Sequence, residues 1–174
     1  MPADGPLRET VERCITELSA RYGVAPFPPH ITIASSFSSF GCAEAAARAV
    51  APLFRDGDGS KLTLRLGMLK HDAECFRCVT ASAAPSKFFG DATIAAEVVK
   101  RNMGGGVSTA VQHAPHMSLL YAEMSAGERV EAVDAVSAIG RVVGETFEAG
   151  SIVVMDVTAR VDYTQWMRRA EVRV

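Results

Sequence analysis

One pattern of five residues occurs twice in the chain, first as Pro29-His30-Ile31-Thr32-Ile33 and then as Pro115-His116-Met117-Ser118-Leu119. Each copy has the order proline, histidine, apolar residue, hydroxyl residue, apolar residue. In an extended strand, the histidine and the hydroxyl residue two positions later lie on the same face, and the apolar residues point to the opposite face. The two copies are separated by almost half of the 174-residue chain. We therefore expect two similar half-domains, each presenting one histidine and one hydroxyl group to a shared cleft.

The hydrophobic pattern along the chain predicts an α+β protein in which each half has the order helix, strand, helix, strand, strand. Apolar residues at steps of three and four predict helices, and alternating apolar residues predict strands. The predicted helices cover residues 6–22, 43–54, 86–102 and 125–139. The predicted strands cover residues 30–36, 61–70, 75–81, 116–121, 146–158 and 163–174.

Composition limits the possible partners. The net charge is −2, which argues against a duplex-binding protein that must neutralise many phosphates. It leaves room for a small phosphate ligand, because a cleft can be locally positive. No apolar stretch approaches about 18 residues, so no membrane span is expected. The N-terminus has no basic region followed by an apolar run, so no secretion signal is expected. We expect a cytoplasmic monomer.

The four cysteines are predicted to be reduced structural thiols. Cys75 and Cys78 have the spacing of half a zinc site, but no second pair of cysteines or histidines completes it. They also fall in a predicted strand, where an odd offset of three places them on opposite faces. We therefore expect no metal site and no cofactor.

The repeated histidines suit acid–base chemistry. Imidazole can gain or lose a proton near neutral pH. Two histidines at one reacting centre suit hydrolysis of a phosphodiester, in which one deprotonates water and the other protonates the departing sugar oxygen. The hydroxyl groups of Thr32 and Ser118 can donate hydrogen bonds to the phosphate oxygens. We expect the second nitrogen of each ring to bind a backbone carbonyl or another acceptor that fixes the tautomer.

Each of these residues also has a structural interpretation. A single His-x-Thr segment on a strand is usually a partly exposed histidine without a role, and it is the matched repetition that favours function. His71 is interpreted as a solvated residue at a hairpin turn, and His113 as a surface or rim residue. Trp166 and Tyr163 allow two interpretations, namely stacking on a nucleobase or packing in the core or at a sheet edge.

The two stretches resemble the signature pair of the two-histidine (2H) phosphoesterase superfamily. The run His116-Met117-Ser118-Leu119-Leu120-Tyr121 is similar to the cyclic phosphodiesterase branch, and Phe76-Arg77-Cys78-Val79 before a long helix also resembles that branch. The resemblance implies a single bilobal α+β domain over residues 1–174. Two antiparallel sheets would line a central cleft, with helices outside and a pseudo-two-fold axis between the lobes.

The same resemblance implies an activity and its residues. The substrates would be ADP-ribose 1″,2″-cyclic phosphate, a tRNA-splicing by-product opened to ADP-ribose 1″-phosphate, and nucleoside 2′,3′-cyclic phosphates, opened to 2′-phosphates. His30 and His116 would be the catalytic pair, and Thr32, Ser118 and Tyr121 would bind the substrate. We assign His116 as the base for water and His30 as the acid, with the roles exchanged if the substrate binds in the reverse sense.

Two alternatives remain open at this point. The first is an RNA 2′,3′-cyclic phosphodiesterase or 2′–5′ RNA end-processing enzyme of the same superfamily, and the scattered lysines and arginines favour a small substrate over a long RNA. The second is a non-catalytic nucleotide- or RNA-binding module in which the histidines only bind phosphate.

Overall fold

A computed structural model describes residues 1–55, 59–84, 86–104, 114–157 and 165–174. It confirms an α+β architecture with two antiparallel sheets. The helices of this described part are α1 (Pro6–Tyr22), α2 (Phe40–Val50), α3 (Ser86–Asn102) and α4 (Ala126–Ile139). Its strands are β1 (Thr63–His71), β2 (Val79–Ala84), β3 (His116–Leu120), β4 (Thr146–Glu148), β5 (Ser151–Asp156) and β6 (Met167–Arg173).

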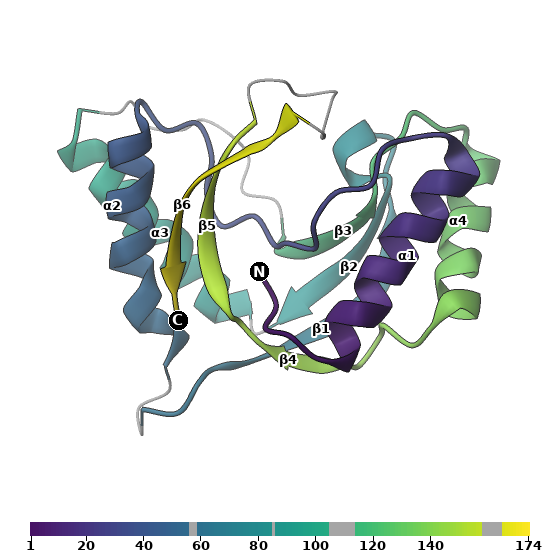
Figure 1. Cartoon of the computed structure of the whole chain (residues 1–174), viewed down its shortest axis with the longest axis horizontal. Coiled ribbons are helices and arrows are strands. Elements are labelled where there is room, and N and C mark those ends of the chain that lie inside the picture. Colours follow the sequence, from purple (N-terminus) through teal and green to yellow (C-terminus); the bar gives the residue numbers. More distant parts are fainter. Residues whose placement is uncertain (56–58, 85, 105–113, 158–164) are drawn as a thin grey trace.

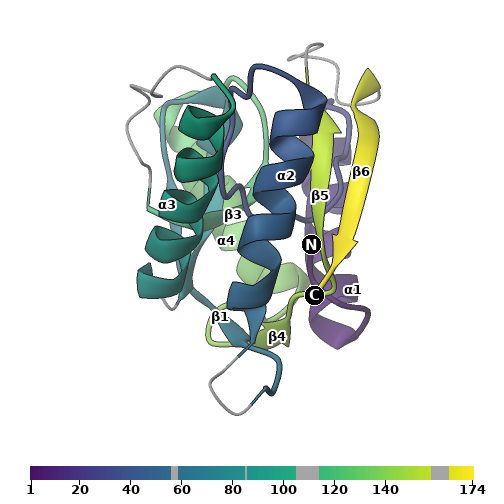
Figure 2. The ribbon, with the colours of Figure 1, turned by 90° about the vertical axis from the view of Figure 1, so that its left-hand side faces the viewer.

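The strands form a curled four-stranded sheet in the order β3-β2-β1-β4 and a separate two-stranded sheet of β5 and β6. Helices α1 and α4 contact each other and cover the larger sheet, whereas α2 packs against α3 and against both strands of the smaller sheet. Figure 1 shows these helix pairs on opposite flanks, with the strands between them. Figure 2, seen from the side of α2 and α3, shows the same layering.

Each flank combines elements from both halves of the chain. The hairpin of β1 and β2 belongs to the first half, yet β2 pairs with β3 and β1 pairs with β4, both from the second half. In the same way, α2 from the first half packs on β5 and β6 from the second. The two halves are therefore interleaved, although the order of their elements along the chain is similar.

Local sequence signals explain why the predicted helices form. Leu7, Val11, Ile15 and Leu18 are buried along one face of α1, which ends at Gly23 in the left-handed conformation with φ 67°. Helix α4 begins with a capping box, in which the side chains of Ser125 and Glu128 satisfy each other's backbone N–H groups.

The helix predicted over 43–54 is longer at its start and is broken near its end. It begins at Phe40, because the Ser39 side chain accepts a hydrogen bond of 3.2 Å from the Cys42 backbone N–H. The α-helix ends at Val50, and Ala51–Phe54 is a 3₁₀ turn that contains Pro52. Proline has no N–H to continue the helical hydrogen bonds, so the regular α-helix stops there.

Strand β1 shows why the predicted alternation fails near its middle. Leu64 and Leu66 are buried as predicted, but Met68 is 67% exposed. The register against β2 shifts between Leu66 and Leu69, so that Leu69 takes the inward place that alternation gave to Met68. Such a bulge adds one residue to one strand and reverses the faces beyond it.

The strand predicted over 75–81 is wrong at its beginning. Cys75–Arg77 forms a 3₁₀ turn, and β2 runs from Val79 to Ala84. Cys75 and Cys78 therefore do not lie on opposite faces of a strand. All four cysteines are free thiols, and all except Cys75 are buried.

The strand predicted over 146–158 is divided into β4 and β5, because residues 1–3 lie along its middle. Pro2 forms an isolated bridge with Ala149, and the Gly150 N–H donates to the Met1 carbonyl at 2.9 Å. The last strand, predicted over 163–174, is confirmed as β6 from Met167. Its predicted first residue, Tyr163, lies outside the described residues.

The strand predicted over 30–36 is not a regular strand. These residues make a single antiparallel bridge, between Ile31 and Met117. Among the described residues, no helix is long and apolar enough to cross a membrane.

Candidate active site

The bridge between Ile31 and Met117 brings the two copies of the repeated pattern side by side. Because the bridge is antiparallel, its register places His30 opposite Ser118 and Thr32 opposite His116. Directly opposed residues of antiparallel segments point to the same face. This register puts each histidine position across from the hydroxyl position of the other copy, and the contacts of Tyr121 with both His30 and Ser118 agree with it. Sequence analysis predicted that the two copies share a cleft, but it did not predict this direct contact.

The two imidazole rings are held in the same way. His30 Nδ1 lies 2.8 Å from the Pro28 carbonyl oxygen, and His116 Nδ1 lies 2.9 Å from the Ala114 carbonyl oxygen. A carbonyl oxygen only accepts, so in both rings Nδ1 carries the hydrogen and the neutral form has its lone pair on Nε2. The predicted backbone acceptor is thus present in both copies, two residues before each histidine.

Tyr121 connects the two copies. Its hydroxyl oxygen lies 3.2 Å from His30 Nε2, so the phenol donates to that nitrogen's lone pair. Burial raises the pKa of Tyr121 to about 12, and a hydrogen bond with Ser118 acts in the opposite direction. The phenol is therefore protonated throughout the neutral range. It touches His30 from the first copy and Ser118 from the second.

The two hydroxyl residues have different surroundings. Ser118 is 3% exposed, and its hydroxyl donates to the Phe76 carbonyl oxygen at 3.2 Å. Thr32 is exposed to solvent. The threonine is therefore the more accessible of the two hydroxyl groups, and the serine is tied to the turn before β2.

The electrostatics of the site favour a neutral His30. Burial lowers the pKa of His30, although its hydrogen bond to the Pro28 carbonyl raises it. The positive charges of the Met1 ammonium group and of His116 lower the pKa of His30 further.

Aromatic side chains surround His30 and Tyr121. Phe27 stacks on the Tyr121 ring with centroids 3.9 Å apart, and Phe76 meets that ring edge-on at 5.5 Å. Trp166 lies 6.0 Å from the His30 ring and 6.2 Å from the Tyr121 ring. Trp166 thus lies at the site and also packs against the main core cluster, so the two interpretations of this residue do not exclude each other.

Phe27 is the site residue that sequence analysis did not single out. Its only signal was its position just before the Pro28-Pro29-His30 run. Phe76 entered only through the family resemblance, because nothing local indicates that its turn closes over Tyr121. No local pattern indicates the place of either residue in the site, because that place depends on contacts between distant segments.

The remaining candidates lie elsewhere. His71 is exposed at the end of β1, as predicted, and His113 lies outside the described residues. A small pocket of about 30 Å³ lies on the side of Ile31 and Ile33 and is mostly apolar, with Phe54, Leu64 and Phe89 among its lining. Neither His30 nor His116 lines it. Within the described ranges, no group of three or more histidine, cysteine or acidic side chains is arranged to hold a metal ion.

Fold and site together define an α+β protein in which two His-x-hydroxyl segments meet in antiparallel register beside an aromatic cluster. Comparison of the sequence with protein-family models and with curated proteins found no match.

Proposed function

We propose that the protein is a metal-independent cyclic phosphodiesterase with the bilobal fold of the 2H phosphoesterase superfamily. Its substrates would be ADP-ribose 1″,2″-cyclic phosphate and nucleoside 2′,3′-cyclic phosphates. The observation that carries the proposal is the antiparallel bridge between Ile31 and Met117, which brings the two histidine segments together while both imidazoles are held in the same tautomer. An acid, a base and donors to phosphate oxygens are what ring opening by water requires.

The geometry favours His30 as the base. Its Nε2 carries a lone pair that already accepts a hydrogen bond, and its lowered pKa keeps it neutral. In this scheme, Nε2 of His30 takes a proton from water as the water oxygen bonds to phosphorus. The bond from phosphorus to one sugar oxygen breaks, and protonated His116 gives that oxygen its proton. This assignment exchanges the two roles that we expected from the sequence.

The hydroxyl groups contribute unequally to this scheme. Thr32 is exposed and can donate to a non-bridging phosphate oxygen from its solvent-accessible position. The Ser118 hydroxyl must leave the Phe76 carbonyl before it can donate to phosphate.

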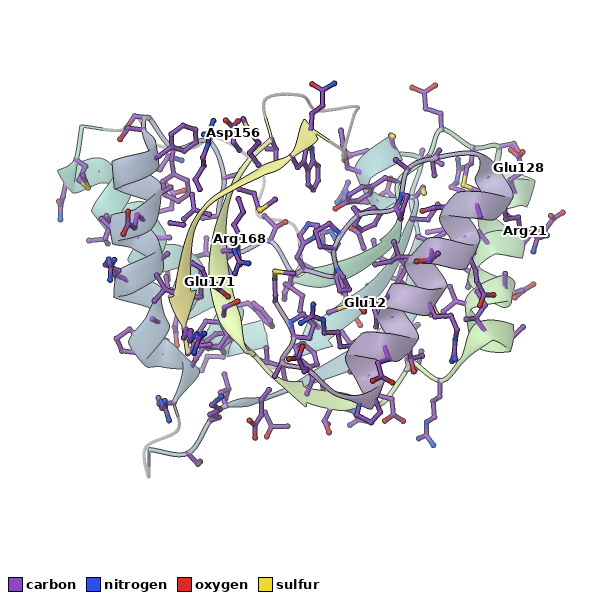
Figure 3. All side chains as sticks on the ribbon, in the orientation of Figure 1. Glu12, Arg21, Glu128, Asp156, Arg168 and Glu171 are labelled. Carbon is purple, nitrogen blue, oxygen red and sulfur yellow. The ribbon has the colours of Figure 1, made fainter. Side chains whose placement is uncertain are left out.

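The surroundings of the histidines favour a small nucleotide. Trp166 beside His30 and Phe76 beside Tyr121 are both partly accessible aromatic rings, and nucleobases stack on such rings. The basic residues of the nearby β6 are largely paired: Arg168 with Glu171, and Arg169 with Asp156 at 2.8 Å. Figure 3 shows Arg168 and Glu171 along the small sheet, far from Arg21 and Glu128 on the opposite flank. The charges of these two arginines are therefore neutralised by neighbouring carboxylates, which favours a small substrate over a long RNA.

Phosphorus NMR tests the proposal directly. Purified protein with EDTA is mixed with each cyclic phosphate and, separately, with an RNA oligonucleotide that ends in a 2′,3′-cyclic phosphate. We expect the small cyclic phosphates to open, with the 2′-phosphate as the product from nucleotides. Turnover of the RNA alone would favour an RNA end-processing enzyme. Binding of all three without turnover would overturn the enzyme proposal and favour a binding module.

A further inference from the structure

The two catalytic candidates are supported in different ways. His116 begins a regular strand, in which β3 pairs with β2 over several residues. His30 begins a segment, residues 30–36, that has one bridge and no further strand partner in the part of the chain that the structure describes. An irregular segment needs other partners for its backbone groups and other means of holding its position.

Side chains of α3 supply these partners. Thr93 Oγ1 donates to the Ile33 carbonyl oxygen at 3.1 Å and also lies 2.8 Å from the Phe89 carbonyl of its own helix. Lys100 Nζ donates to the Ser35 carbonyl oxygen at 3.2 Å. Positions 93 and 100 are two helical turns apart, so both residues lie on the same side of α3.

Lys100 is unusual because it is 2% exposed. Lysine is almost never fully buried unless its charge is paired. The Lys100 ammonium group has two such partners. It forms an ion pair with Glu97, whose Oε1 lies 3.2 Å away, and a cation–π contact with Phe37, whose ring centroid lies 5.7 Å away. The second oxygen of Glu97 is buried without a hydrogen-bond partner among the described residues. Such a buried pair is a poor source of stability, so a role in fixing the conformation accounts better for its presence.

The contacts of Lys100 enclose a strained turn. Ser36 has a φ of 59°, and it is the one residue other than glycine with positive φ in the described ranges. A left-handed conformation at serine is unfavourable and persists when its surroundings hold it. Lys100 binds the carbonyl of Ser35 just before this turn and the ring of Phe37 just after it.

We infer that Thr93 and Lys100 are positioning residues that fix the first histidine segment against β3 and so set the placement of His30 relative to His116. The inference rests on the proposed function, which requires this placement. A displacement of about 1 Å at a catalytic group can lower a rate about 10²-fold, so side chains that hold the segment matter for catalysis without touching the substrate.

The test uses the full chain with the double substitution Lys100→Met/Glu97→Gln, which removes the ammonium group without leaving a buried carboxylate alone. Lys87→Met is the matched control, because Lys87 lies on the same helix, is 86% exposed and forms an i,i+4 pair with Asp91. We expect kcat to fall about 10- to 100-fold in the double variant, with KM changed much less. Lys87→Met should retain the wild-type rate.

A readout independent of activity separates positioning from general damage. Nitrogen NMR of the imidazoles follows each histidine, and we expect the His30 signals and the pKa of His30 to change while those of His116 stay in place. Unchanged His30 signals in a folded double variant would overturn the inference, as would equal changes at both histidines. If the double variant does not fold, Thr93→Val removes one of the two hydrogen bonds with little change in volume and is judged by the same signals. Absence of phosphodiesterase activity in the wild type would refute the proposed function, while the NMR result would still decide whether α3 positions His30.

Discussion

The hydroxyl oxygen of Tyr121 lies 3.2 Å from Nε2 of His30, across a separation of 91 residues in the chain. The nitrogen that the proposed mechanism uses as a base is therefore already bonded to a phenol. A hydrogen bond donated to the neutral ring favours the neutral form of that ring. The attacking water must either share His30 Nε2 with the Tyr121 hydroxyl or displace that hydroxyl from it.

Replacement of Tyr121 by phenylalanine should raise the pKa of His30, because the neutral ring loses its donor. The acidic limb of the pH–rate profile should move to higher pH. Proton NMR titration of the His30 ring measures the shift directly. Tyr22→Phe is the control, because the hydroxyl of Tyr22, on α1, donates to the Glu128 carbonyl of α4 at 3.3 Å. An acidic limb that stays in place in Tyr121→Phe would show that the contact does not influence the base.

Removal of either imidazole should slow the reaction strongly. We expect His30→Ala and His116→Ala each to lower kcat by roughly 10²–10⁴, which is the usual contribution of a general acid or base. His71→Ala should be as active as the wild type, because His71 is exposed at the far end of β1. Steady-state rates with a 2′,3′-cyclic nucleotide measure all three. A near-wild-type rate for His30→Ala or His116→Ala would remove that residue from the mechanism.

The stability of the protein should depend on the protonation of His30. The pKa of His30 is lower in the folded chain than its ordinary value of about 6.5, so the unfolded chain binds more protons in that range. Its contribution to stability is therefore full above about pH 6.5 and is lost as the pH falls through the folded pKa. Urea unfolding between pH 8 and pH 5 should show a steeper loss in the wild type than in His30→Gln. Parallel curves would contradict the lowered pKa.

Substitution of Thr32 should affect substrate binding or turnover, whereas substitution of Ser118 should affect the stability of the fold. Thr32→Val should weaken substrate binding or turnover with little effect on unfolding, because Thr32 is exposed. Ser118→Ala should lower the free energy of unfolding by about 0.5–1.5 kcal/mol, because it removes the hydrogen bond from the Ser118 hydroxyl to the Phe76 carbonyl. Denaturant titration beside kinetic assays measures both effects. Equal loss of stability in the two variants would mean that the exposed hydroxyl also has a structural partner.

Elements stabilised by local signals could be predicted from the sequence. The bounds of α1 and α3 match the prediction. A stripe of apolar residues indicates α1, and a serine at the start with a glycine run after the end indicates α3. The bulge in β1 could not be predicted, because Leu64, Leu66 and Met68 continue an unbroken alternation. The sequence does not show which residues of β2 oppose them.

The candidate site could be predicted as a set of residues but not as an arrangement. The repeated pattern identified both histidines and both hydroxyl residues, and the family resemblance added Tyr121. The crossed register of His30 with Ser118 depends on how two distant segments align, which no local pattern encodes. Residues 30–36 were predicted as a strand because their alternation suits one. Their actual support comes from Thr93 and Lys100 on α3.

The interleaving of the two halves has a consequence for how the protein acquires its site during synthesis. When the hairpin of β1 and β2 leaves the ribosome, the strand that flanks β2 and carries the partner of Ile31 has not yet emerged. The nascent chain therefore carries its first histidine without the surface that orients it. Neither half, expressed as a separate fragment, would contain the complete four-stranded sheet, and the two would have to associate before the imidazoles could meet.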